Sequence, residues 1–173
     1  MSRGRTDLQT AVLETTWGSL SIAASDRGVA ACRLPRAPSR PVPFRVSRVR
    51  VPPGSPPVLR RAADFARAVV EGRAPGKCPA LDAAALGGAT EFRRSVWTAL
   101  RKIPRGGALT YFELARRAGH PRAARAAGSA CGANPLPLFI PCHRAVAANG
   151  GLGGFSAGLR WKARLLTGEG TWR

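Results

Sequence analysis

The sequence is poor in acidic residues, histidine and tyrosine. Its 173 residues include 9 Asp and Glu against 28 Lys and Arg, with two histidines, one tyrosine and four cysteines. No run approaches the roughly 18 uninterrupted apolar residues that a membrane-spanning helix needs. The first ten residues lack the apolar core of a signal peptide. We therefore expect a cytoplasmic protein with no membrane partner.

The cysteines do not have the spacing of a metal site. Cys32, Cys78, Cys131 and Cys142 contain no C-x-x-C pair, and neither histidine stands at a normal ligand spacing from them. In a reducing compartment such residues remain thiols. The sequence therefore predicts no bound metal.

The excess of positive charge indicates a polyanionic partner. The formal net charge is +19, and nearly all of the basic residues are arginine. Arginine binds phosphate bidentately and stacks on bases, so nucleic acid is the first candidate, although a GC-rich genome also enriches arginine. Residues 1–88 carry 14 basic and 6 acidic side chains, whereas residues 89–173 carry 14 and 3. The second half is the better candidate for the binding surface.

The first half predicts a small sheet with one helix. Alternating residues and the turn sequence Asp26-Arg27-Gly28 indicate a hairpin, and apolar residues at helical spacing indicate a helix. In chain order we expect a hairpin over residues 10–34, a Pro/Arg-rich loop or edge strand over 35–57, a helix over 58–71, an irregular link over 72–89 and a helix from Thr90 to Pro104.

Two short helices separated by a tight turn follow. Thr110 and Glu113 form a capping-box pattern, Gly119 is a typical residue after a helix end, and Pro121 stands where the next helix would begin. This second helix would continue to Gly132. The pattern predicts a helix-turn-helix.

The second helix has small side chains apart from Arg122 and Arg125. Such a helix contributes little to a core but can approach another surface closely, such as a DNA groove. The alternative is a tightly packed internal helix with two solvated arginines.

Cys142 and His143 follow residues 136–140, an apolar run that predicts a buried strand. Neighbours in a strand point to opposite faces, so a partnership between the two side chains would need a bridging water. A thiol needs help to become a thiolate, and a histidine held by a carboxylate can act as the base. Glu169 is the only acid of the second half that does not open a predicted helix. The alternatives are a structural Cys-His pair and an unrelated Cys-His hydrolase.

The stretch IPCHRAV resembles the I/V-P-C-H-R-V signature of the O6-alkylguanine-DNA alkyltransferases, also called methylated-DNA–protein-cysteine methyltransferases. The likeness extends over about residues 90–170 and includes TYFELARRAGHPRAARAAGSACGANPLPLFIPCHR and GGFSAGLRWKARLLTGEG. It implies an α+β fold, with a ribonuclease H-like sheet-and-helix domain over residues 1–88 and a mainly helical domain with a helix-turn-helix over 89–173.

The implied activity is irreversible, single-turnover transfer of an alkyl group from O6 of guanine, or O4 of thymine, in DNA to a cysteine thiol. The protein would then be a methylated-DNA–[protein]-cysteine S-methyltransferase. One alternative is a non-catalytic, alkyltransferase-like DNA-damage sensor, in which the cysteine is replaced. Another is a plain DNA-binding module.

The resemblance implies catalytic roles for five residues. Cys142 would be the nucleophile, and His143 would act as its base through a water, oriented by Glu169. Asn134 would fix the turn that presents the cysteine. Tyr111 would donate a proton to guanine N3, so that the base leaves in neutral form.

The resemblance also implies base flipping, because O6 cannot be reached inside the stack. Arg125 would enter the duplex, Ser156 would lie near O6, the Ala145 carbonyl would lie near the exocyclic amine, and Phe155 would help close a loop over the base. The remaining expected DNA contacts on the recognition helix, which would lie in the minor groove, come from Arg122, Ala124, Gly128 and Ser129.

The expected partner is double-stranded DNA containing O6-alkylguanine. The protein would work as a monomer, associated with the nucleoid through its DNA. No cofactor is expected, because the alkyl group is already activated by its attachment to guanine.

Overall fold

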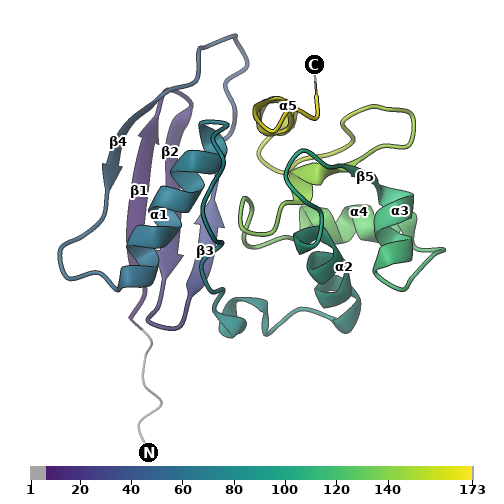
Figure 1. Ribbon diagram of the computed structural model, residues 1–173, viewed down its shortest axis with the longest axis horizontal. Coiled ribbons are helices and arrows are strands. Elements are labelled where there is room, and N and C mark those ends of the chain that lie inside the picture. Colours follow the sequence, from purple (N-terminus) through teal and green to yellow (C-terminus); the bar gives the residue numbers. More distant parts are fainter. Residues whose placement is uncertain (1–6, 173) are drawn as a thin grey trace, which may run out of the picture.

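The computed structural model describes residues 7–172, which form an antiparallel sheet with one helix beside a group of shorter helices (Figure 1). The elements in chain order are β1 Gln9–Thr15, β2 Gly18–Ala24, β3 Val29–Arg33, β4 Val46–Arg50, α1 Pro57–Val70, the 3₁₀ helix η1 Ala83–Leu86, α2 Glu91–Arg101, β5 Leu109–Thr110, α3 Tyr111–Arg117, α4 Ala124–Gly132, the 3₁₀ helix η2 Cys142–Arg144, β6 Ala145–Val146 and α5 Leu159–Gly168.

The sheet has the strand order β3-β2-β1-β4, and α1 lies across one of its faces (Figure 1). Alternate residues of β1 and β2 point toward the helix, as the period of a strand requires. Leu13 pairs with Leu20 across the two strands, and both are fully buried. Leu59 and Ala66 of α1 are fully buried as well. These apolar faces form the core of the first half.

Most of the expected elements of the first half are present, with one correction. Residues 10–34 form three strands, not one hairpin, because a second turn occurs at Thr16-Trp17. The turn at Asp26-Arg27-Gly28 joins β2 to β3. Residues 35–57 contain an edge strand, β4, and the predicted helix is α1. The boundary predicted between residues 88 and 89 stays a prediction.

The capping box before Tyr111 is confirmed. The Thr110 hydroxyl accepts the Glu113 N–H, and the Glu113 carboxylate accepts the Thr110 N–H at 2.7 Å. The next helix begins at Ala124 instead of Pro121, so the predicted start is wrong. Ala123 has φ −108° and ψ 31°, and its N–H donates to the carbonyl of His120 in a turn.

The predicted strand over residues 136–140 is also wrong. The segment is buried but irregular, because Pro135 and Pro137 have no N–H for a strand ladder. Instead, Ile140 N donates to Leu136 O, and Leu138 adopts a φ of 75°. The chain then enters η2. Cys142 and His143 therefore occupy a helical turn, so the alternation argument that separated them does not apply.

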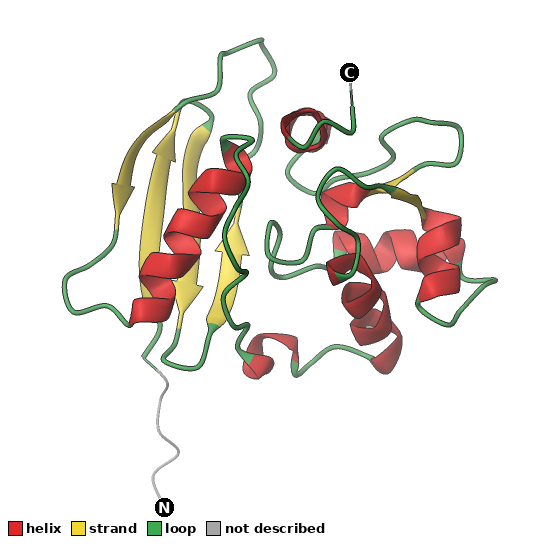
Figure 2. Ribbon diagram, in the orientation of Figure 1, coloured by secondary structure: helices red, strands yellow, loops and turns green. Residues whose placement is uncertain are grey.

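Helix α5 of the second half contacts α1 of the first half. Figure 2 shows α5 end-on, next to the loops that connect the two halves. Gly168 packs so closely on Gly72 that a Cβ at Gly168 would lie 2.8 Å from the Gly72 Cα. Trp161 of α5 is fully buried. Within residues 7–172, no helix has the length and hydropathy to cross a membrane.

The capping box yields a stability prediction. Thr110→Val removes the hydroxyl that caps α3 and should lower the free energy of unfolding by about 1 kcal/mol, measured by urea denaturation. Thr98→Val on the exposed face of α2 is the matched control, because it makes the same change without a cap. Equal losses in the two variants would contradict a capping role.

Candidate active site

Cys142 lies in a pocket of about 110 Å³ between α3, α4, η2 and the loop before α5. The residues that line it are Tyr111, Gly128, Cys131, Gly132, Cys142, Gly154, Phe155 and Ser156. Five of these were predicted from the sequence to contact the substrate. The pocket therefore gathers residues from four separate segments around one thiol.

The Cys142 thiol is held by Asn134. The Asn134 Nδ2 donates to the sulfur at 3.2 Å and to the Ile140 carbonyl at 2.8 Å, while its Oδ1 accepts the Leu136 N–H at 3.0 Å. The side chain amide therefore fixes the irregular segment that presents the cysteine. This geometry agrees with the position that the sequence analysis gave to Asn134.

Burial raises the pKa of the Cys142 thiol, although the Asn134 hydrogen bond and the Lys162 ammonium partly oppose the shift. Cys142 is only 6% exposed. Because its pKa lies above the ordinary cysteine value, the protonated form dominates at neutral pH. Nucleophilic chemistry at this sulfur therefore requires a base.

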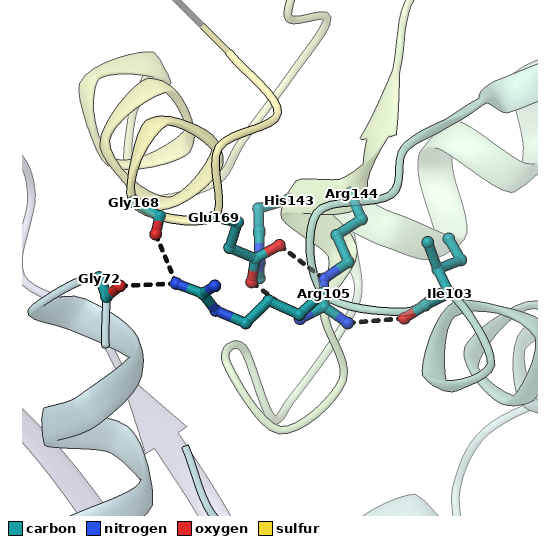
Figure 3. Close-up of polar contacts among 7 residues, drawn as sticks. All are labelled: Gly72, Ile103, Arg105, His143, Arg144, Gly168 and Glu169. Atoms are coloured by element: carbon teal, nitrogen blue, oxygen red, sulfur yellow. Dashed lines mark hydrogen bonds and ion pairs between the residues drawn. The ribbon is translucent and has the colours of Figure 1, made fainter. Parts of the chain in front are cut away.

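His143 and Arg144 both bind the Glu169 carboxylate at the end of α5 (Figure 3). The His143 Nε2 lies 3.0 Å from Glu169 Oε1, and Arg144 donates to both carboxylate oxygens at 2.8 and 2.9 Å. A carboxylate only accepts hydrogen bonds, so the histidine proton is on Nε2. The structure thus brings together the predicted His143–Glu169 pair.

The other ring nitrogen of His143, Nδ1, is buried and has no hydrogen-bond partner among the described residues. In the neutral tautomer with a proton on Nε2, Nδ1 carries a free lone pair. No hydrogen bond joins the His143 ring to Cys142 within residues 7–172. An acceptor nitrogen is therefore available for a small bridging donor such as water.

The charges of this network are strongly perturbed. Burial alone would raise the pKa of Glu169, but the hydrogen bonds from His143 and Arg144 outweigh it and lower the pKa to about 2. Burial lowers the pKa of His143, although the neighbouring Glu169 opposes this. At neutral pH the pair consists of a carboxylate and a neutral imidazole.

Arg105 holds the end of α5 next to Glu169. Its Nη2 donates to the carbonyls of Gly168 and Gly72, and therefore joins α5 to the chain after α1 (Figure 3). Arg144 donates in addition to the Ile103 carbonyl. The position of the carboxylate is thus fixed by contacts from both halves of the chain.

Lys162 is a site residue that the sequence analysis did not find. It is fully buried on α5, and its ammonium donates to the carbonyls of Ala145 and Gly154 and to the Tyr111 hydroxyl at 3.4 Å. In the sequence, the position of Lys162 directly after Trp161, in a helix that ends in apolar residues, was the pattern that could have indicated a buried lysine. The Ala145 carbonyl, expected to meet the base, is already in contact with this ammonium.

Tyr111 approaches the pocket loop closely. Its hydroxyl accepts the Gly154 N–H at 3.2 Å. A Cβ at position 153 would lie 2.8 Å from the Tyr111 hydroxyl, and the φ of Gly153 is +72°, so glycine is required there. Burial raises the pKa of Tyr111 above its ordinary value, which keeps the phenol protonated.

Of the residues expected to contact DNA, Gly128, Phe155 and Ser156 line the pocket, and those of the turn and helix that follow here lie outside it. Arg125 and Ser129 are exposed on α4, Ala124 is half-buried at its start, and Arg122 is exposed in the turn before it. Gly128 faces the pocket, and a Cβ at this position would lie 3.7 Å from the nearest atom of the Tyr111 ring. The described residues contain no cluster of three His, Cys, Asp or Glu side chains that could hold a metal.

Comparison with known proteins decides the family. Residues 91–171 match the family described as 6-O-methylguanine DNA methyltransferase, DNA binding domain. A Methanosarcina mazei methylated-DNA–protein-cysteine methyltransferase is 43% identical over 106 residues, which are 60% of this chain and 67% of that protein. The chain belongs to the methylated-DNA–protein-cysteine methyltransferase family. The proposed site lies within the matched segment.

Two further relatives show how far the likeness extends. A Methanosarcina acetivorans enzyme of the same name is 49% identical over 82 residues, covering 47% of this chain and 53% of that protein. The matches thus span about half the length of several curated relatives. The structure of Mycobacterium tuberculosis OGT in complex with DNA superposes with a TM-score of 0.71 at 29% identity, covering 93% of this chain and 92% of that one. The likeness in fold, a mixed α/β architecture, therefore covers both halves of the chain.

The charge network of this family member predicts a loss of stability in acid. The pKa of Glu169 is lowered in the folded state, so its contribution is present above the unfolded value near 4.3 and is lost as pH falls toward about 2. His143, also lowered, adds a loss as pH falls below its ordinary value. Glu169→Gln should therefore cost on the order of 3 kcal/mol at pH 7, and the difference from wild type should narrow between about pH 5 and pH 2.

Urea unfolding across this pH range provides the measurement. Asp64→Asn, which alters an exposed carboxylate on α1, is the control and should cost little at pH 7. A Glu169→Gln penalty that is constant over the whole range would contradict the assigned ionisation.

Proposed function

We propose that this protein repairs DNA by transferring an alkyl group irreversibly from O6 of guanine, and from O4 of thymine, to the Cys142 thiol. The observation that carries the proposal is a buried thiol in a small pocket, held by Asn134, with a neutral His143 beside it that Glu169 orients. Membership in the family and the likeness to a solved OGT bound to DNA support it.

The proton of Cys142 leaves through a bridging water to His143 Nδ1. This route uses the buried nitrogen that has no partner among the described residues, and it requires the tautomer that Glu169 imposes. The resulting imidazolium is stabilised by the Glu169 carboxylate. In this scheme His143 is the base and Glu169 positions it.

The thiolate then attacks the alkyl carbon in line. A sulfur–carbon bond forms, the carbon–O6 bond breaks, and its electron pair passes into the guanine ring. The Tyr111 hydroxyl donates a proton to N3, so a neutral base leaves. Lys162 donates to the same hydroxyl oxygen and favours loss of its proton. The thioether product is stable, so each molecule acts once and needs no cofactor.

DNA binding would use α3 and α4 as a helix-turn-helix, with α4 in the minor groove. The small residues Ala124, Gly128 and Ser129 permit a close approach, and the exposed Arg125 fills the space of the flipped nucleotide. The sheet with α1 would be the ribonuclease H-like domain. We place the protein in the cytoplasm, as a monomer on nucleoid DNA.

The central test is a mass measurement. Incubation with a duplex containing O6-methylguanine should add one methyl group to the intact protein, and Cys142→Ala should gain nothing. Tight binding of the damaged duplex without a mass gain in the native protein would indicate a damage sensor instead. Multiple turnover on a small ester would indicate a hydrolase.

Arg125→Ala tests base flipping. The variant should react with O6-methylguanine in duplex DNA at least roughly tenfold more slowly, because unstacking the nucleotide costs a few kcal/mol. Its reaction with free O6-benzylguanine should be unchanged, since no base needs to leave a stack. The exposed Arg93→Ala on α2 serves as the charge-matched control. Equal loss on both substrates in Arg125→Ala would contradict the flipping role.

A further inference from the structure

The segment rich in proline and arginine between β3 and β4 has no role in the proposed reaction. We call residues 35–44 the strap. It leaves the sheet at its upper end and turns toward α5 (Figure 1). The prolines at four of its ten positions have no N–H, so the strap cannot pair as a strand and leaves carbonyl oxygens free to accept.

Two indole N–H groups bind the two ends of the strap. Trp161 Nε1, in the first turn of α5, donates to the Pro35 carbonyl at 2.8 Å. Trp17 Nε1, in the turn between β1 and β2, donates to the Val42 carbonyl at 2.8 Å. The strap is therefore bound both to the sheet and to the helix that carries the active-site lysine and leads to Glu169.

The arginine next to Trp161 binds the middle of the strap. Arg160 Nη1 donates to the carbonyls of Pro38 and Arg40, and its guanidinium stacks 5.2 Å from the ring centre of Trp17. A guanidinium can bind two carbonyls at once because its N–H groups form a planar fork. No carboxylate contacts Arg160 within residues 7–172. Its contacts are directed to the strap.

Three aromatic rings pack together at the strap, and one of them, Phe44, belongs to it. The centroids of Trp17, Phe44 and Trp161 are 4.9 to 5.3 Å apart, all in edge-to-face pairs. Such pairs stabilise beyond the area they bury. The strap is thus a packed part of the fold, although it has no regular secondary structure.

The strap also contacts the loop that forms one wall of the pocket, residues 153–158. Ala37 N donates to Ala157 O at 3.2 Å, directly after the pocket residues Phe155 and Ser156. At its other end the loop is held by Tyr111, through Gly154. One anchor of the pocket loop therefore comes from the second half of the chain and the other from the first half.

We propose that the strap positions the pocket loop for capture of the alkylated base, and that Arg160 and the Ala37 N–H are its positioning groups. The inference rests on the proposed function for its substrate, but the geometry of the loop stands apart from that function. Among the described residues, no hydrogen bond or ion pair joins the strap to Cys142, His143 or Glu169. The strap should therefore govern substrate binding and leave the bond-breaking step unchanged.

Two independent variants remove these contacts. Arg160→Gln deletes the fork that binds Pro38 and Arg40, and Ala37→Pro deletes the one N–H that reaches Ala157 in a segment already rich in proline. Ala37→Ser keeps the N–H and is the matched control. Arg160→Lys keeps the charge and should retain part of the wild-type affinity for substrate. Arg61→Gln on the exposed face of α1 controls for the change in net charge.

The measurement is the rate of Cys142 alkylation by free O6-benzylguanine as a function of its concentration, followed by intact mass. In Ala37→Pro the half-saturating concentration should rise about fivefold, the effect of one lost hydrogen bond. In Arg160→Gln, which loses two hydrogen bonds, it should rise at least as much. The limiting rate constant should stay within about twofold of wild type. Affinity for unmodified duplex DNA should not change, because α4 is untouched.

The proposal would be overturned if both variants had the half-saturating concentration of the wild type, or if only the limiting rate constant fell. Amide hydrogen exchange of residues 153–158 gives a readout that does not depend on activity. If the wild-type protein fails to react, the proposed function fails, and faster exchange of this loop in both variants still supports the strap. Unchanged exchange would refute it. Cooperative thermal unfolding shows whether each variant is folded. If one variant does not fold, the result for the other variant decides.

Discussion

The ion pair between Glu169 and Arg144, shared with His143, is the contact on which the site depends. It joins the first residue after α5 to the turn that presents the cysteine, although the two lie 25 residues apart in the sequence. A buried carboxylate is tolerated only when its oxygens are hydrogen-bonded. Here three donor groups satisfy it, and the same bonds determine which nitrogen of the histidine carries the proton.

The two halves of the chain meet around this ion pair. Arg105 binds carbonyls after α1 and at the end of α5, and Gly72 packs directly on Gly168. On the opposite end of α5, Trp161 and Arg160 bind the strap. The helix is therefore held at both ends by the first half. Between these ends it supplies Lys162, whose ammonium binds the carbonyls of Ala145 and Gly154. None of the residues that line the pocket comes from the sheet, yet segments that adjoin the sheet and α1 hold the helix that leads to Glu169.

Local sequence patterns were sufficient for the elements that depend on local chemistry. The capping box at Thr110, the turn at Asp26-Arg27-Gly28 and the helix over 57–70 follow from side chains a few residues apart. The segment 136–140 was misjudged because its apolar residues satisfy a strand and a buried irregular turn equally. Prolines at 135 and 137 and the amide of Asn134 decide between them. Lys162 was missed because burial of a charge depends on acceptors outside its own helix, here the carbonyls of Ala145 and Gly154, which lie 17 and 8 residues earlier in the chain.

The burial of Cys142 has a consequence for the lifetime of the unreacted protein. In the proposed function, each molecule is consumed by one reaction and must keep its sulfur intact until the substrate arrives. Oxidants and adventitious electrophiles in the cell react with the thiolate far faster than with the thiol. Cys142 is only 6% exposed and its thiol has a pKa above the ordinary value, so it presents little thiolate to them. In the proposed function, burial therefore preserves the thiol of a protein that acts once, and the reaction then depends on His143 as the base that forms the thiolate.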